Sequence, residues 1–256
     1  IKIYLPSLKN ELNSLNKKYK EDLTNLGEEV PSDTQGKHSL YNNIINNICQ
    51  NYELNINQSN TKFNSGRYLK QIFIEYRNNI DSICENISCL DSISDEDLKS
   101  IIINSEGNHM SFPIFKIEAL EACIKDKKIK IFENLHSESV KCVYSIDEKL
   151  IELLDNLLKN DYINRFNLFS KKIREHLINK VFIENRETTI KEISVQIFCE
   201  ENYIWTDHEE FKNQLSQYKN KNNDISMLRK TILCYFQCII EIFKHNIPKL
   251  IMYHYV

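Results

Sequence analysis

Glycine and proline are scarce in this sequence. Its 256 residues include only 4 Gly and 4 Pro, and residues 114–247 contain neither. Turn-rich β and α/β folds need glycine where the backbone takes a positive φ, so the scarcity argues against both classes. The motifs G-x-x-x-x-G-K-[ST] and G-x-G-x-x-G are absent, and a phosphate-binding loop needs such closely spaced glycines. The composition therefore indicates long helices and no nucleotide chemistry within this chain.

The sequence also lacks a charge excess of either sign. Thirty-three Lys and Arg residues face 36 Asp and Glu, which gives a net charge of −3. A nucleic-acid-binding domain usually shows a basic excess, so we expect no nucleic-acid partner. No apolar run is long enough for a membrane-spanning helix. The hydrophobic content of 41% still suffices for one extended core.

Recognisable catalytic and metal-binding patterns are missing as well. The eight Cys form no C-x-x-C, and the seven His form no H-x-x-x-H. Cys234 and Cys238 share a helix face, and Asp207–Glu210 groups one imidazole with three acids. Either could bind a metal, but helix packing and a solvated helix end are the simpler interpretations. We expect no catalytic, cofactor-binding or metal-binding residue here, and reduced cysteines serving as small core residues of a cytosolic protein.

Apolar residues recur every three or four positions along most of the chain, a spacing typical of amphipathic helices. The last run contains Pro248, which should kink it. Runs this long do not fit a compact ball, so the sequence predicts an all-α, elongated antiparallel four-helix bundle. The expected helical segments are 7–26, 38–57, a helix to about 90 that follows a polar patch at 58–66, a short helix from Ser94, a run from 112 to 160, a run from 162 to 204 with a kink or short break at 184–187, and a run from 225 to 256; residues 212–224 read as a polar linker.

Two surface features allow two interpretations each. The basic stretch Lys125–Lys130 could contact phosphate or membrane, although a solvated helix face looks the same. Tyr253, His254 and Tyr255 follow Ile251-Met252, so this helix end is apolar on more than one side. Such a helix must be covered by a second surface, which is either the bundle core or another subunit.

Several stretches, in order along the chain, resemble the stalk of dynamin-related proteins. The chain starts at Ile1 and ends within a helical pattern at Val256, so we expect an internal fragment of a longer protein. The resemblances are Leu5–Asn10 to the "LPxLK" start of the stalk, Leu26–Val30 to "YGEPV", Gly66–Phe73 to "GARINRIF", Tyr203–Phe211 to "YINTDHEDF" at the end of the middle domain, and Ile247–Met252 to "MPKTIMHLMI" of the GTPase effector domain.

The resemblance implies a domain organisation. Residues 1–211 would be the middle domain with stalk helices 1 to 3, 212–224 a linker, and 225–256 the start of the GTPase effector domain as stalk helix 4. A GTPase head, which binds GTP and Mg in the intact protein, would precede this chain. The partners implied are a second copy, further copies in a filament, the protein's own GTPase domain, and a membrane reached through an absent insert or an adaptor. The protein would be cytoplasmic, recruited peripherally to organelle or vesicle membranes to drive their fission.

The resemblance also assigns self-assembly residues. The loop around Gly66 usually carries an assembly Arg two residues on, where this chain has Tyr68, with Arg67 one position early. The loop at Gly107 usually carries Arg where this chain has His109. An Arg fork donates two parallel hydrogen bonds and carries a permanent positive charge, which Tyr and a near-neutral His do not, so we expect altered filament contacts.

A central dimer contact completes the implied interface. It would include Met252, Tyr255 and Val256 at the end of the last helix. The alternative for the whole chain is a helical adaptor or tethering scaffold unrelated to any GTPase, with the same fold and no head domain.

Overall fold

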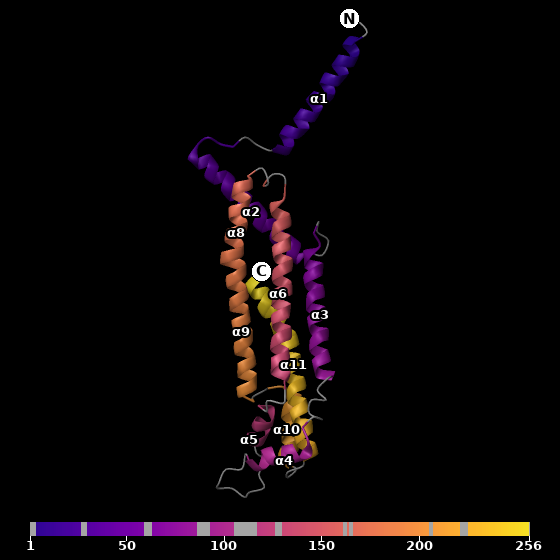
Figure 1. The fold of residues 1–256 in the computed structure, drawn as a ribbon, viewed down its shortest axis with the longest axis vertical. Coiled ribbons are helices and arrows are strands. Elements are labelled where there is room, and N and C mark those ends of the chain that lie inside the picture. Colours follow the sequence, from indigo (N-terminus) through magenta and orange to yellow (C-terminus); the bar gives the residue numbers. More distant parts are fainter. Residues whose placement is uncertain are drawn as a thin grey trace. The chain divides into compact units, whose positions relative to one another are not determined.

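The computed structural model shows a helical protein (Figure 1). It describes residues 4–26, 30–58, 63–85, 93–104, 117–125, 130–160, 163, 166–204, 207–220 and 225–255. Within these ranges every regular element is a helix and no strand occurs, which confirms the predicted all-α bundle. The elements are α1 (Tyr4–Leu26), α2 (Thr34–Asn57), α3 (Ser65–Glu85), α4 (Asp95–Asn104), α5 (Ile117–Ile124), α6 (Ile131–Leu158), α8 (Asn167–Leu177), η2 (Ile178–Phe182), α9 (Ile183–Asn202), α10 (Glu209–Asn220) and α11 (Ile225–Tyr255).

The chain divides into two compact units. The first comprises Ile1–Arg67 with Glu148–Ile183, and the second comprises Tyr68–Asp147 with Glu184–Val256. The boundaries lie inside α3 and α6 and beside η2, a short π-helix. The helix runs without a break through 184–187, where a kink or short break was expected, and the wider π-helical turn lies just before that position, at 178–182.

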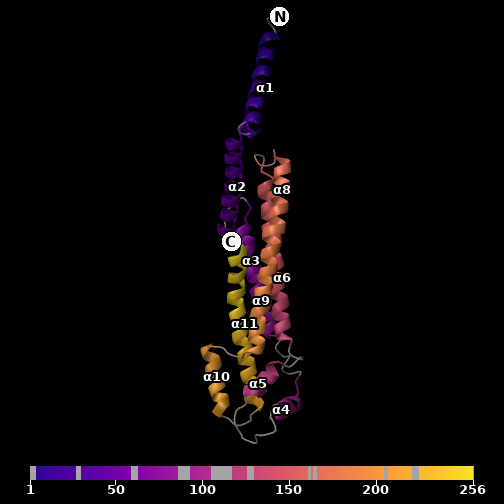
Figure 2. The same cartoon turned by 90° about the vertical axis from the view of Figure 1, so that its left-hand side faces the viewer.

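The second unit is an antiparallel four-helix bundle of α3, α6, α9 and α11, which lie side by side in both views (Figures 1 and 2). Contacts between facing side chains join the four helices, and α6 and α9 run in opposite directions because His136 meets Ser194 while Asp147 meets Arg186. Tyr76 of α3 lies 3.1 Å from Ser139 of α6, and His136 of α6 lies 3.0 Å from Ser194 of α9. Lys244 of α11 donates to Asp81 of α3 at 2.6 Å. The core is apolar and its largest fully buried side chains include Ile80, Leu135, Ile146, Tyr235, Phe236 and Phe243.

In the first unit, α2 packs against α8 and against the later part of α6. Asp33 caps α2, its carboxylate accepting from the Gly36 amide at 2.7 Å. The rings of Tyr41 and Phe169 meet edge to face with centroids 5.3 Å apart. The Asp155 carboxylate accepts two hydrogen bonds from the Arg174 guanidinium, at 2.5 and 2.9 Å.

The helix α1 carries an apolar stripe that the other described residues leave uncovered. The spacing that predicted this helix recurs in the structure, but its large apolar side chains are exposed. They are Leu8, Leu12, Leu15, Tyr19 and Leu23. A stripe of this kind is stable in water only when another surface covers it.

Two expectations about chain breaks need correction. The run from 112 to 160 is not one helix, since α5 ends at Ile124 and α6 begins at Ile131. The expected linker 212–224 is helical as far as Asn220. Its helix forms because Phe211 is buried against Tyr235, with ring centroids 5.4 Å apart, so tertiary packing overrides a polar composition. At Pro248, where a kink was expected, the helix does not end: the proline lies inside α11, which continues to Tyr255.

Gly66 sits where the start of α3 approaches the end of α2. A Cβ at this position would collide with the carbonyl oxygen of Ile56 and come within 3.1 Å of the carbonyl oxygen of Gln58. Both neighbours are backbone atoms, which cannot move aside cheaply. The glycine therefore has a packing role in addition to any role in assembly.

We predict that Gly66→Ala lowers the free energy of unfolding by about 1–3 kcal/mol, because the added methyl overpacks a backbone contact. Far-UV circular dichroism during urea unfolding would measure the change. Lys70→Ala, on an exposed position of α3, is the control and should stay within about 0.5 kcal/mol of the parent. Equal midpoints for both variants would contradict the prediction.

Candidate self-assembly surface at the end of α11

The last turn of α11 is tied to α6 by a buried charge. The Asp147 side chain is only 4% exposed, and its Oδ2 lies 2.7 Å from Nη1 of Arg186. The hydroxyl of Tyr255 donates to the other oxygen, Oδ1, at 3.1 Å. The Arg186 guanidinium also lies over the Tyr144 ring, 5.4 Å from its centroid. Three helices of the second unit thus meet at one carboxylate.

A second set of contacts ties the same turn to α9. The backbone carbonyl of His254 accepts a hydrogen bond from the side-chain Nδ2 of Asn185 at 2.6 Å. This satisfies a carbonyl that the helix end would leave without a partner. The His254 Nε2 lies 3.1 Å from Oε2 of Glu192. The end of α11 is therefore held from two sides.

Outside these contacts, Tyr253 projects from the bundle with 81% of its surface exposed. Its ring meets the His254 ring edge to face at 5.3 Å. Met252 is half-buried, and Tyr255 is 7% exposed. Tyr253 is therefore accessible at the surface, whereas Tyr255 lies inside the bundle.

The other predicted interface residues lie elsewhere along the chain. Gly66, Arg67 and Tyr68 begin α3, where Arg67 and Tyr68 are exposed. The Arg67 amide donates to the Asn64 carbonyl at 3.1 Å. Gly107, His109 and Val256 lie outside the described residues, and their assembly roles stay predictions.

Sequence reasoning missed Asp147 and Arg186. A signal existed for Asp147, because it follows Ile146 on the face formed by Val143, Ile146 and Leu150, where an acid is out of place. An acid on a buried stripe indicates a buried partner. Arg186 carries no such signal, since it lies in a polar stretch.

The alternative metal sites gain no support. The two thiols at 234 and 238 pack inside the second unit, where burial raises the pKa of Cys238 to about 12 and disfavours the thiolate that binds metals. Asp207 forms an ion pair with Lys212 at 2.7 Å, and Glu209 and Glu210 occupy the first turn of α10. Across the described parts of the chain, no three His, Cys, Asp or Glu side chains gather as metal ligands would. None of the helices described there has the length and apolar content to cross a membrane.

Residues 1–220 match the model of the dynamin central region. The chain belongs to this family. It is 26% identical over 213 residues to vacuolar protein sorting-associated protein 1 of Schizosaccharomyces pombe, a match that covers 81% of this chain and 30% of that protein. It is 24% identical over 224 residues to dynamin-B of Dictyostelium discoideum, covering 82% of this chain and 23% of that protein.

The family match fixes what kind of segment this is. The chain spans less than a third of the length of either relative. It is a stalk segment from the middle of a dynamin-family protein and holds no GTPase domain of its own. The match continues through α10 to Asn220, nine residues beyond the end expected at 211.

We predict that Arg186→Leu lowers the free energy of unfolding by about 3–5 kcal/mol, because it leaves the Asp147 carboxylate buried without a countercharge. The matched control is Arg174→Leu, which breaks the more exposed pair with Asp155. That change should cost about 1 kcal/mol or less. Urea unfolding of both variants measures the difference. Similar decreases in the free energy of unfolding would show that the buried pair of Arg186 with Asp147 stabilises the fold no more than the exposed pair does.

Proposed function

We propose that this chain is the self-assembly stalk of a dynamin-like large GTPase that oligomerises on membranes to drive organelle or vesicle fission. Membership of the dynamin central-region family supports the proposal. The observation that carries it is the end of α11, where an exposed Tyr253 stands on a helix turn that Asp147 and Arg186 hold in place.

The end of α11 has the features of a small association surface. Tyrosine is enriched at interfaces because its ring gives a large apolar area and its hydroxyl a hydrogen bond. The turn below it is fixed by the contacts of Tyr255 and His254, so little order would have to be gained on binding. In a two-fold dimer the same patch meets its copy, and Tyr253 would lie near the axis.

The other parts of the proposal belong to the intact protein. A GTPase domain elsewhere in the longer protein would bind GTP and Mg, and its hydrolysis would act on the membrane through the assembled stalks. Recruitment to the membrane from the cytoplasm would be peripheral, through an insert or an adaptor. The uncovered stripe on α1 supports further contacts with parts of the protein outside this chain.

Tyr68 and His109, which stand where the family usually has Arg, are expected to change the contacts between stalks in a filament. Tyr68 is half exposed on α3, so it can contact a partner but cannot offer the paired donors of a guanidinium. We propose filament contacts that differ from those of relatives with Arg at these positions. The alternative of an adaptor unrelated to a GTPase loses ground to the family match.

We predict that the chain forms dimers at micromolar concentration and that Tyr253→Lys raises the dimer dissociation constant at least about tenfold, roughly 1.4 kcal/mol. Lysine would bring an unpaired charge into the contact. Val256→Lys should act in the same direction. Sedimentation velocity over a concentration series measures both.

The control is Tyr203→Lys, which changes another exposed tyrosine of the second unit, 67% exposed. It should leave the dissociation constant unchanged. A parent chain that stays monomeric up to about 100 μM would overturn the proposal. Equal effects of the substitutions at 203 and 253 would remove Tyr253 from the interface.

A further inference from the structure

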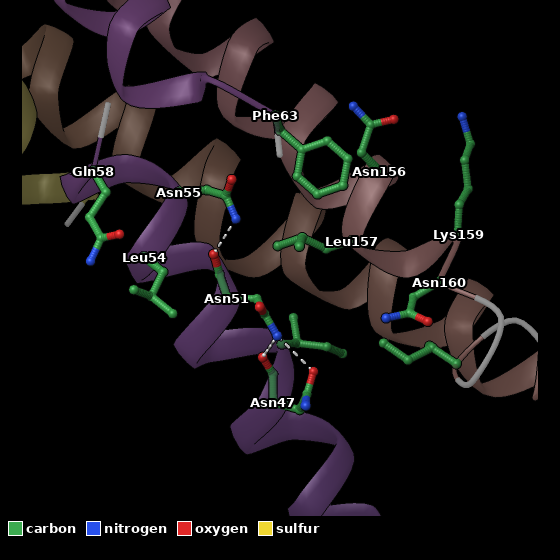
Figure 3. A pocket seen from close by; sticks show the side chains of 12 residues that line it. Asn47, Asn51, Leu54, Asn55, Gln58, Phe63, Asn156, Leu157, Lys159 and Asn160 are labelled. Atoms are coloured by element: carbon green, nitrogen blue, oxygen red, sulfur yellow. Dashed lines mark hydrogen bonds between the residues drawn. The ribbon is translucent and has the colours of Figure 1, made fainter. Parts of the chain in front are cut away.

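A pocket lined by amide side chains lies in the first unit, between the second half of α2 and the end of α6 (Figure 3). Its volume is about 640 Å³, within the range of ligand sites. Ile48, Leu157 and Ile163 form apolar lining, and Phe63 stands at one side. The amides that line it are Asn47, Asn51, Asn55, Gln58, Asn156 and Asn160.

One of these amides is buried with its oxygen unsatisfied. Asn55 is 6% exposed, and its Nδ2 donates to the carbonyl of Asn51 at 2.8 Å. Figure 3 shows its Oδ1 turned away from that carbonyl. No hydrogen-bond donor of the described residues reaches this oxygen. A buried acceptor left unpaired costs on the order of 1–3 kcal/mol, so the site favours a ligand that brings an N–H or O–H group.

The amides of α2 form a ladder with a regular spacing. Asn51 Nδ2 donates back to the carbonyl and the Oδ1 of Asn47, both at 2.8 Å, in the same way that Asn55 turns to Asn51. With their nitrogens bonded to the helix, Asn51 and Asn55 present oxygens. Positions four apart on a helix rise by about 6 Å. Alternate residues of an extended chain are about 6.6 Å apart, so their N–H groups match this ladder.

The charge of the lining residues indicates more closely which class of ligand the pocket can bind. Among its described lining residues Lys159 carries the only charge, and no carboxylate is present. Neutral amides suit a neutral backbone, which both donates and accepts hydrogen bonds. A single exposed cation favours a ligand with an acidic side chain at that end.

We propose that this pocket binds an extended, acidic peptide segment of a partner protein through the peptide's main-chain amides. The N–H of one peptide residue would donate to Asn55 Oδ1, and the N–H two residues further along would donate to Asn51 Oδ1. An acidic side chain of the peptide would lie toward Lys159. The lining residues belong to the first unit, and the end of α11 belongs to the second. Binding of the peptide therefore does not require self-assembly.

An array of N-acetylated, C-amidated pentapeptides with a central Asp, probed with the full chain, tests the proposal. The strongest binders are then measured by fluorescence anisotropy. We expect dissociation constants below about 100 μM. N-methylation at alternate residues of the best peptide removes its N–H donors and should weaken binding at least about tenfold. Replacing the central Asp with Lys should weaken it about threefold or more.

Variants of the chain locate the site. Asn55→Leu keeps the branching at Cγ and the number of side-chain heavy atoms while it removes the unpaired oxygen, so it should fold and lose at least about tenfold in affinity. Asn47→Ala, on an exposed position, gives a second variant if the first fails to fold. Asn78→Leu, an exposed position of α3, is the control and should bind as the parent does.

Three outcomes would overturn the proposal. The first is that no array peptide binds more tightly than about 1 mM. The second is that Asn55→Leu, or Asn47→Ala where it is used, binds the best peptide as well as Asn78→Leu does. The third is that acetamide at the same concentration of amide groups displaces the peptide fully, which would make the site a pocket for a small amide.

Discussion

The second unit depends on the burial of α11 along its whole length. Half of the helix is enclosed, since 15 of its 31 residues are buried, from Met227 in its first turn to Tyr255 in its last. A helix that is apolar on most sides has to lie in the interior of a bundle. The helices α3, α6 and α9 supply three of the covering surfaces, and α10 covers the beginning of α11 with Phe211. Sequence segments that are far apart are thus joined through one helix.

Apolar burial holds α11 in the bundle, but it fixes poorly how far the helix is shifted along its axis, because one apolar turn resembles the next. Polar contacts supply that information. Lys244 meets Asp81 near the middle of α11, Arg229 meets Asp95 near its start, and Tyr255 meets Asp147 at its end. Each of these pairs can form at only one position of α11 along its axis. The buried Asp147 is the strictest of them, because a shift would leave a charge without its partners.

The helices were predictable because their apolar spacing is a local property. The segments 7–26, 38–57 and 225–256 agree with α1, α2 and α11 to within a few residues. The extent of α10 was not predictable, because its formation depends on Phe211 meeting Tyr235, a contact between elements. Which side chains at the end of α11 are exposed was harder still to predict. Tyr253 and Tyr255 look equivalent in the sequence, and only the position of Asp147 shows which of them is buried.

That decision follows from helix geometry. Successive residues of an α-helix turn by about 100°, so Tyr253 and Tyr255 point about 200° apart and cannot both face one surface. Once Tyr255 turns inward to Asp147, Tyr253 has to face out. The neighbours of Tyr253 on that face are the exposed Asn246 and Lys249 and the half-buried Leu250. A surface with so little apolar area is typical of an association that forms and breaks readily, because strong permanent interfaces bury larger apolar areas. The hydrogen bond from Tyr255 to Asp147 therefore has two effects on the proposed assembly surface: it closes the bundle, and it limits how much apolar surface the end of α11 exposes.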